Sequence, residues 1–153
     1  MDSDEAGLPI TPKLVGALYT EAMLLADEAR SYFDSAGRED RDALDPFARV
    51  GFSCESLKVT TRLMHVIAWL LTQRAVESGE LSRAQARSPS RRLGESPESD
   101  EALLPRLPEA ARALIEASRD LFARVQRLDE RAVSPESVPS PARSLLSRLE
   151  RAF

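Results

Sequence analysis

The amino-acid sequence predicts an all-α protein, a three-helix antiparallel bundle with a long central helix. Apolar residues recur at spacings of three and four along three segments, which indicates amphipathic helices. Thr11-Pro12 and Asp45-Pro46 are helix-start signals, with a capping side chain followed by proline in the first turn. The 153 residues include only five Phe, two Tyr and one Trp, so Leu, Ala and Val must fill most of the core. Such a core suits helices that meet along narrow seams.

The first helix is expected at about residues 12–35, after a disordered acidic leader over residues 1–10. Its apolar residues share one face, at Leu14, Leu18, Leu25, Ala29 and Phe33. Gly37 is a natural end, because glycine readily takes the left-handed conformation on which helices often finish. A charged connector over residues 38–44 then leads to the second start signal.

The central helix is expected at about residues 46–78, up to the break at Gly79, and would be roughly 50 Å long at about 1.5 Å per residue. It carries two apolar stripes. The first stripe has the 3, 4 spacing of a bundle seam and consists of Phe47, Val50, Cys54, Leu57, Thr61, Met64, Ala68, Leu71 and Ala75. The second stripe lies roughly 160° away at about 100° per residue and consists of Phe52, Val59, Leu63, Val66 and Leu70.

A helix that is apolar on two opposite faces must be covered on both. One interpretation is that the first and third helices each cover one face. The preferred interpretation is a homodimer in which the central helices of two copies pair through the second stripe. A third is that the C-terminal segment folds back over that face. The pattern does not decide which stripe faces the core of the single chain. Trp69 lies off both stripes and is expected to pack under the third helix.

The remaining segments are a loop, a third helix and a tail. Residues 82–104 contain Pro89 and Pro97 together with several Ser and one Gly, so we expect a flexible loop in which only Ser82 to Arg87 could be helical. The third helix is expected at about residues 107–132, which closes a bundle over 11–133, and residues 134–153 form a Pro/Ser linker with a short amphipathic tail. The candidate partner-binding residues of the loop and tail are Arg83, Arg87, Arg91, Arg92, Leu145, Leu146 and Leu149.

The sequence contains no catalytic constellation. His65 is the sole histidine, and it lies about 16 Å along the helix axis from Cys54, so the two cannot form a dyad within one chain. Cys54 is expected to be a small buried seam residue, and acidic pairs such as Asp129-Glu130 are expected to be solvated. There is no glycine-rich phosphate loop, dinucleotide fingerprint or metal-ligand spacing. We therefore expect no enzyme, cofactor or metal.

Charge and hydropathy limit the class of partner. The net charge of −4 argues against nucleic acid, whose phosphates need a basic surface. The longest strongly apolar stretch, Leu63 to Leu71, is far shorter than the roughly 20 residues of a membrane span. The acidic N-terminus does not look like a signal peptide, and a single cysteine allows no internal disulfide. These features indicate a cytoplasmic protein that binds other proteins.

The central helix resembles a known family. The run from Glu55 to Met64, then Ala68-Trp69-Leu70-Leu71, and the later run from Leu121 to Asp129 are similar to the signature of the alphaproteobacterial DUF1465 family. This resemblance implies a dimeric three-helix bundle with a disordered C-terminal tail. It also implies an adaptor role, in which the protein helps the ClpXP protease receive a cell-cycle regulator together with a response-regulator partner and a cyclic-di-GMP-binding partner. His65 stands where the family is expected to have Gln.

The function expected from the sequence is thus that of a non-enzymatic adaptor in regulated proteolysis. Holding a weak substrate near a protease raises its capture through effective concentration, without new chemistry. The alternative is a dimeric helical scaffold or localisation protein with no link to a protease.

Overall fold

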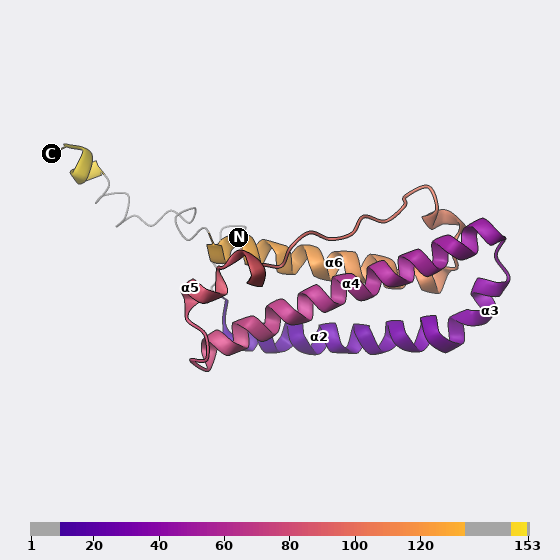
Figure 1. The fold of residues 1–153 in the computed structure, drawn as a ribbon, viewed down its shortest axis with the longest axis horizontal. Coiled ribbons are helices and arrows are strands. Elements are labelled where there is room, and N and C mark those ends of the chain that lie inside the picture. The colour runs from indigo at the N-terminus through magenta and orange to yellow at the C-terminus, as the bar shows by residue number, and fades with distance from the viewer. Residues whose placement is uncertain (1–9, 134–147, 153) are drawn as a thin grey trace, which may run out of the picture.

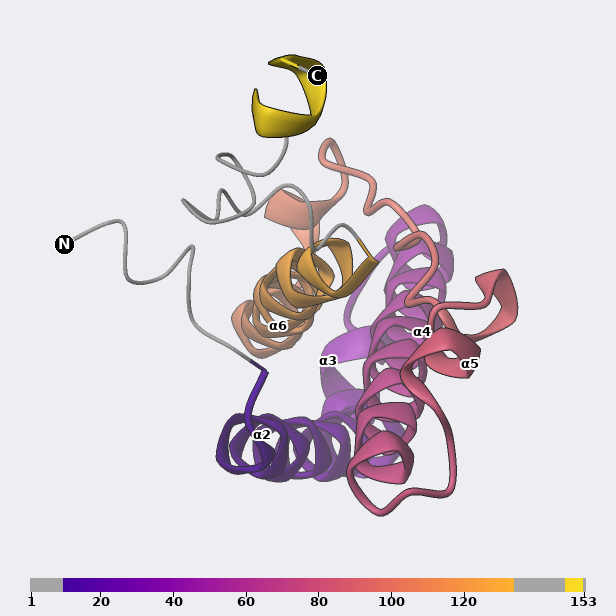
Figure 2. The same ribbon diagram turned by 90° about the vertical axis from the view of Figure 1, so that its left-hand side faces the viewer.

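The computed structural model describes residues 10–133 and 148–152. Three long helices pack together: α2 (Pro12–Ser31), α4 (Pro46–Glu77) and α6 (Glu109–Val133). Seen end-on, they stand at the corners of a triangle (Figure 2). No strand occurs within the described ranges, so the prediction of an all-α fold with three main helices is confirmed. The expected leader, apart from Ile10, and the expected linker and tail, apart from residues 148–152, lie outside the described residues.

The direction of the third helix differs from the prediction. Side-chain contacts join Arg62 to Ser118 and Trp69 to Asp129, so residue numbers rise together along α4 and α6. These two helices are therefore parallel, and the predicted antiparallel, up-down-up order is wrong for α6. After α4 the chain runs back along the bundle before α6 begins (Figure 1). Only α2 is antiparallel to α4.

The helix starts follow the sequence signals. The Thr11 hydroxyl accepts a hydrogen bond from the Leu14 amide at 3.1 Å, and the Asp45 carboxylate accepts one from Ala48 at 2.9 Å. Each side chain satisfies one of the amides that a helix N-terminus leaves unpaired. At the other end of α4 the break predicted at Gly79 is confirmed, and this glycine takes φ = 82°, a left-handed conformation on which helices often finish.

Gly37 does not end the first helix. The chain continues from α2 through a π-helix over Tyr32–Ala36 into α3 (Gly37–Asp42), and Gly37 has φ = −79°. Its role is close approach: a Cβ there would lie 2.7 Å from the Tyr32 carbonyl oxygen and 2.9 Å from the Tyr32 ring. The Tyr32 hydroxyl donates a 2.7 Å hydrogen bond to Asp40, which ties the π-helix to α3.

Between α4 and α6 lie three short elements, α5 (Arg83–Ala86), η2 (Pro89–Arg91) and η3 (Leu104–Arg106). Residues 92–106, which we call the crossover segment, return the chain to the start of α4. Its Leu93, Leu103 and Leu104 are buried. Gly51 of α4 makes room for it, because a Cβ there would lie 2.0 Å from a Leu103 methyl carbon.

Candidate binding surfaces

The crossover segment is held by a buried arginine of α4. Arg62 is 1% exposed, and its Nε donates to Ser96 Oγ at 3.1 Å. Its Nη2 donates to the Pro97 carbonyl and to Ser99 Oγ, both at 2.8 Å, while Nη1 donates to Ser118 Oγ of α6 at 3.2 Å. One guanidinium thus joins α4, α6 and the crossover segment. The loop expected to be flexible is anchored here, because a buried cation needs the oxygens that the loop supplies.

A buried carboxylate on the same face of α4 adds a second anchor. Glu55, which is 1% exposed, accepts a hydrogen bond from Lys58 at 2.8 Å and one from the Asp100 amide at 3.4 Å. Burial raises the pKa of Glu55, but the hydrogen bonds from Lys58, Ser99 and the Asp100 amide together bring that pKa below its usual value. Burial lowers the pKa of Arg62, and the charge of nearby Glu55 opposes this effect.

A third anchor lies near the start of the crossover segment. Trp69 is 3% exposed and its Nε1 donates to Asp129 of α6 at 2.9 Å, which confirms that Trp69 packs under the third helix. The same carboxylate accepts from Arg92 Nε at 3.0 and 3.1 Å. Asp129 is only 5% exposed, so the expectation that it is solvated is wrong. Arg92, a candidate for binding partners, is occupied by this internal ion pair.

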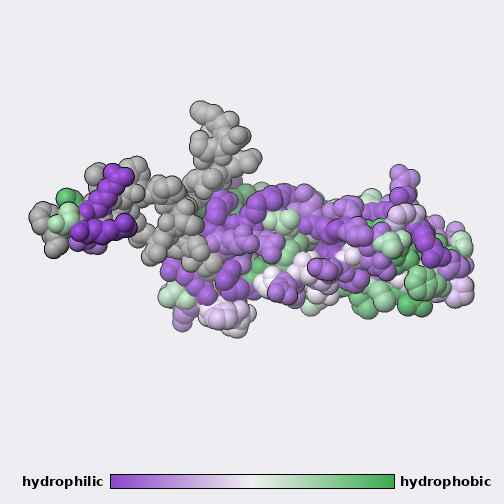
Figure 3. Space-filling model, turned by 90° about the horizontal axis from the view of Figure 1, so that it is seen from above, coloured by the Kyte–Doolittle hydropathy of each residue, from purple (hydrophilic) through white to green (hydrophobic). Residues whose placement is uncertain are grey.

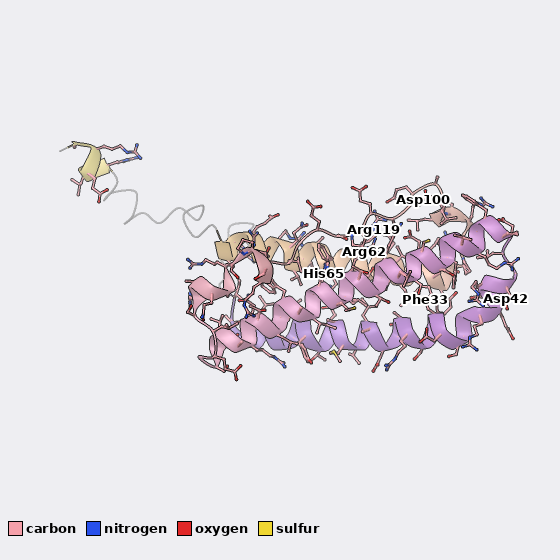
Figure 4. All side chains as sticks on the ribbon, in the orientation of Figure 1. Phe33, Asp42, Arg62, His65, Asp100 and Arg119 are labelled. Atoms are coloured by element: carbon pink, nitrogen blue, oxygen red, sulfur yellow. The ribbon has the colours of Figure 1, made fainter. Side chains whose placement is uncertain are left out.

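An open groove of about 670 Å³ lies where the crossover segment passes α6. Its lining residues include Arg62, Arg119, Phe122, Gln126 and Glu98, with no histidine or cysteine among them. Figure 4 shows Arg62 and Arg119 beside the part of the crossover segment that carries Asp100. The lining has polar groups that could hydrogen-bond to a ligand, but it lacks a nucleophile paired with a base.

The second stripe of α4 lies inside the chain. All five of its residues are at most 3% exposed: Phe52, Val59, Leu63, Val66 and Leu70. They belong to the core that α4 forms with α2 and α6. The predicted dimer interface is therefore wrong in its residues, because side chains already packed within one copy are not available to another.

The first stripe of α4 is the exposed one. Five of its residues are large and leave 47–68% of their surface accessible, namely Phe47, Val50, Leu57, Met64 and Leu71. Cys54 is exposed as well, so the expectation that it is a buried seam residue is wrong. Apolar side chains gather at the end of the molecule formed by α3 and the first turns of α4 (Figure 3). The 3, 4 spacing made this stripe visible in the sequence, but not the side of the core on which it lies.

The other candidate residues are distributed away from this stripe. Arg83, Arg87 and Arg91 are exposed on and after α5, at the opposite end of α4 from Phe47. Leu149 is 53% exposed. Leu145 and Leu146 lie outside the described residues.

Reactive and metal-ligating groups are not gathered in the part of the chain that the structure describes. His65 is half-buried on α4, and its Nδ1 has no hydrogen-bond partner there. No group of three His, Cys, Asp or Glu among the described residues is placed to hold a metal ion. Over the same ranges, no helix is both long enough and apolar enough to cross a membrane.

These features define a helical-bundle protein whose distinguishing parts are an anchored crossover segment and an exposed apolar helix face. The chain matches the model of a family described as "Protein of unknown function (DUF1465)" over residues 9–153. It therefore belongs to the DUF1465 family. Its structure is similar to the crystal structure of RcdA from Caulobacter crescentus CB15, with a TM-score of 0.65 and 34% sequence identity, covering 80% of this chain and 93% of that one. A search of curated proteins found no match.

Proposed function

We propose that this chain is a non-enzymatic cytoplasmic adaptor that helps deliver a cell-cycle regulator to the ClpXP protease. Its partners are the protease or a co-adaptor, the substrate regulator and a second copy of the chain, with no role for nucleic acid, a membrane or a cofactor. Membership of the DUF1465 family and the 34% identity to RcdA support this proposal, because the adaptor role is what the family resemblance implies.

The observation that carries the proposal is the uncovered apolar face of α4. The single chain already has a core, yet Leu57 and Met64 remain 68% and 64% exposed in the middle of its longest helix. A contiguous apolar patch on a folded protein marks a site of interaction with another macromolecule. We therefore infer that the chain acts by binding another macromolecule through the exposed apolar face of α4.

The anchored crossover segment supports the tethering mechanism. Arg62 and Glu55 fix residues 96–100 to the bundle, so the groove and the exposed α4 face are carried on one body. A body that binds a substrate by one surface and a protease by another raises their effective concentration. Binding at two surfaces therefore suffices for delivery.

The test is a reconstituted degradation assay with ClpXP and a candidate regulator recovered by affinity pull-down of the full chain. We expect the wild-type chain to accelerate degradation and a variant with Arg83→Glu, Arg87→Glu and Arg91→Glu to lose much of this effect. The matched control is Arg112→Glu, a charge reversal at an exposed position of α6. A chain truncated after Val133 tests the tail in the same assay.

The outcomes separate the adaptor from the alternative. If the chain recovers a stable assembly but leaves degradation rates unchanged for every recovered protein, it is a scaffold or localisation protein and the adaptor proposal fails.

A further inference from the structure

We propose that the exposed arginines of α5 and of the turn after it bind a short, extended acidic segment of a partner protein, whose carboxylates stand at alternate positions. The arginines are Arg83, Arg87 and Arg91. This inference rests on the proposed function and deepens it, because it names the chemistry by which one surface of the adaptor recognises its partner.

The stretch from Leu81 to Gly94 carries positive charge alone. It contains the three exposed arginines and Arg92, and it has no aspartate or glutamate. The whole chain has a formal net charge of −4, so this stretch is opposite in sign to the rest of the molecule. Glu80 precedes it and Glu95 follows it, which confines the basic surface to α5 and η2, at the far end of α4 from α3 (Figure 1).

The three exposed arginines have no side-chain partner in the part of the chain that the structure describes. Other surface arginines do pair within the chain, as Arg106 does with Asp45. A guanidinium keeps its charge and carries five N–H donors. Three unpaired guanidinium groups on one surface therefore offer charge-assisted hydrogen bonds to the carboxylates of another molecule.

The backbone that carries these arginines is held at both ends. At its start, the Leu81 amide donates a 3.1 Å hydrogen bond to the Ala75 carbonyl of α4. At its end, Arg92 pairs with Asp129 of α6 at 3.0 Å, and Leu93 is only 3% exposed. A surface that is ordered before binding loses less conformational entropy when a partner binds.

The local structure sets the spacing of the arginines. Ser82 and Gln85 form a capping box that starts α5. Arg83 and Arg87 are four residues apart in helical geometry, which places their Cβ atoms about 5–6 Å apart, and η2 then brings in Arg91. In an extended peptide, side chains two residues apart share one face at about 6.6–6.8 Å. Alternate carboxylates of such a peptide thus match neighbouring guanidinium groups within the reach of an arginine side chain.

The size of the surface favours a short acidic peptide over larger polyanions. Duplex DNA carries a charge about every 1.7 Å along its axis and is bound by a long basic stripe. Anionic membranes are recognised by clusters of about 4–8 basic residues beside an apolar element. A surface of three arginines bounded by Glu80 and Glu95 is too small for either, but it suits two or three carboxylates.

The chain's own first residues are a competing occupant. Asp2 and Asp4 have the alternate spacing. They precede α2, which begins at the end of the bundle where α4 finishes, because Arg74 lies over the ring of Tyr19 at 4.1 Å. The test therefore includes a chain without residues 1–9.

Fluorescence anisotropy with the full chain tests the surface. The probe is a labelled peptide in which serine alternates with three glutamates, and the control peptide has glutamine in place of each glutamate. We expect the probe to bind, with a dissociation constant that rises as salt is raised from about 50 to 200 mM, because exposed charges are screened. The glutamine peptide should bind at least about 10-fold more weakly.

Charge reversal locates the binding. Arg83→Glu, Arg87→Glu and Arg91→Glu together should raise the dissociation constant at least about 10-fold, because like charges would then face the probe. All three positions are exposed, so the helical circular dichroism should stay that of the wild type. The charge-matched control reverses three exposed arginines outside residues 81–94 and should bind within about twofold of the wild type. It carries Arg38→Glu, Arg112→Glu and Arg151→Glu.

Several results would overturn the proposal. One is a probe that does not bind, and another is binding that the glutamine peptide or the triple variant of α5 and η2 retains. Tighter binding of a single-stranded DNA oligonucleotide, or of vesicles containing anionic lipid, would assign the surface to a polyanion instead. A probe that binds only after residues 1–9 are removed would make those residues the occupant in place of a partner.

The peptide assay contains no protease, so it fails independently of the adaptor function. A chain that binds the probe but accelerates no degradation keeps this surface and loses the adaptor role. A chain that accelerates degradation without binding the probe keeps the adaptor role and loses this inference.

Discussion

Replacing Arg62 by methionine should detach the crossover segment and weaken the fold. The substitution keeps an unbranched side chain of similar reach but removes all four hydrogen bonds of the guanidinium to Ser96, Pro97, Ser99 and Ser118. Hydrogen bonds from a charged donor contribute about 1.5–3 kcal/mol each, or roughly 6–12 kcal/mol in sum. The variant no longer has to dehydrate a guanidinium, which offsets several kcal/mol of that loss. We expect a net destabilisation of about 3 kcal/mol.

The loss is measured by urea unfolding followed by circular dichroism, with hydrogen exchange read peptide by peptide. Amides of residues 96–100 should exchange faster in Arg62→Met, since their anchor is gone. The matched control is Arg119→Met, which removes an arginine whose side chain is 35% exposed and which pairs with Glu101 and Glu116 on the surface. That control should cost less than about 1 kcal/mol. If Arg62→Met costs no more than the control and exchange over 96–100 is unchanged, the anchoring role is refuted.

Three further predictions follow from other contacts. Trp69→Phe keeps an aromatic ring but loses the indole hydrogen bond to Asp129, so it should lower the free energy of unfolding in urea by about 1–3 kcal/mol. An unchanged free energy of unfolding would mean that this hydrogen bond does not stabilise the fold. Gly37→Ala should destabilise the fold by about 1–2 kcal/mol, because the alanine Cβ would meet a backbone oxygen. The control is Gly16→Ala, whose Cβ would meet nothing within 4 Å and which should stabilise α2 by about 0.5–1 kcal/mol. Thermal melts in which both substitutions shift the melting temperature in the same direction would contradict this. The folded pKa of Glu55 lies below the 4.5 of a free glutamate, so its carboxylate stabilises the fold fully above about pH 4.5 and loses this contribution as the pH falls through the folded pKa. Glu55→Gln should therefore lose less stability than the wild type between neutral pH and pH 3. An equally steep loss of stability in the variant would refute this role of Glu55.

The sequence predicted the helices well because their signals are local. The caps at Thr11 and Asp45 and the left-handed break at Gly79 depend on neighbouring residues alone. The two apolar stripes of α4 were also visible, since periodicity is a property of one helix. Which stripe faces inward depends on where α2 and α6 dock, and the pattern along α4 carries no information about that.

The crossover segment was misjudged because its order comes from distant partners. Pro, Ser and Gly usually indicate a flexible loop. Here Arg62, 34 residues before Ser96, supplies the hydrogen bonds that hold the segment. A polar residue on a helix flank looks solvated in sequence, and nothing in the pattern along α4 indicated that Arg62 and Glu55 are buried. Two opposite charges a helical heptad apart on a flank, followed by a Ser/Pro loop, are the signal that could have found this anchor.

The crossover segment is just long enough to let α6 run parallel to α4. From the level of Trp69 to that of Asp45, the chain must travel back roughly 36 Å along α4, at about 1.5 Å per helical residue. Arg92 is tied to the level of Trp69 through Asp129, and Arg106 pairs with Asp45. The stretch between them reaches at most about 46–50 Å at 3.3–3.6 Å per residue. Deleting four of these residues would cut the reach to about 33–36 Å at 3.3–3.6 Å per residue, which leaves no slack for the return. The connection therefore has almost no spare length, and a deletion of four residues would strain the parallel docking of α6 on α4.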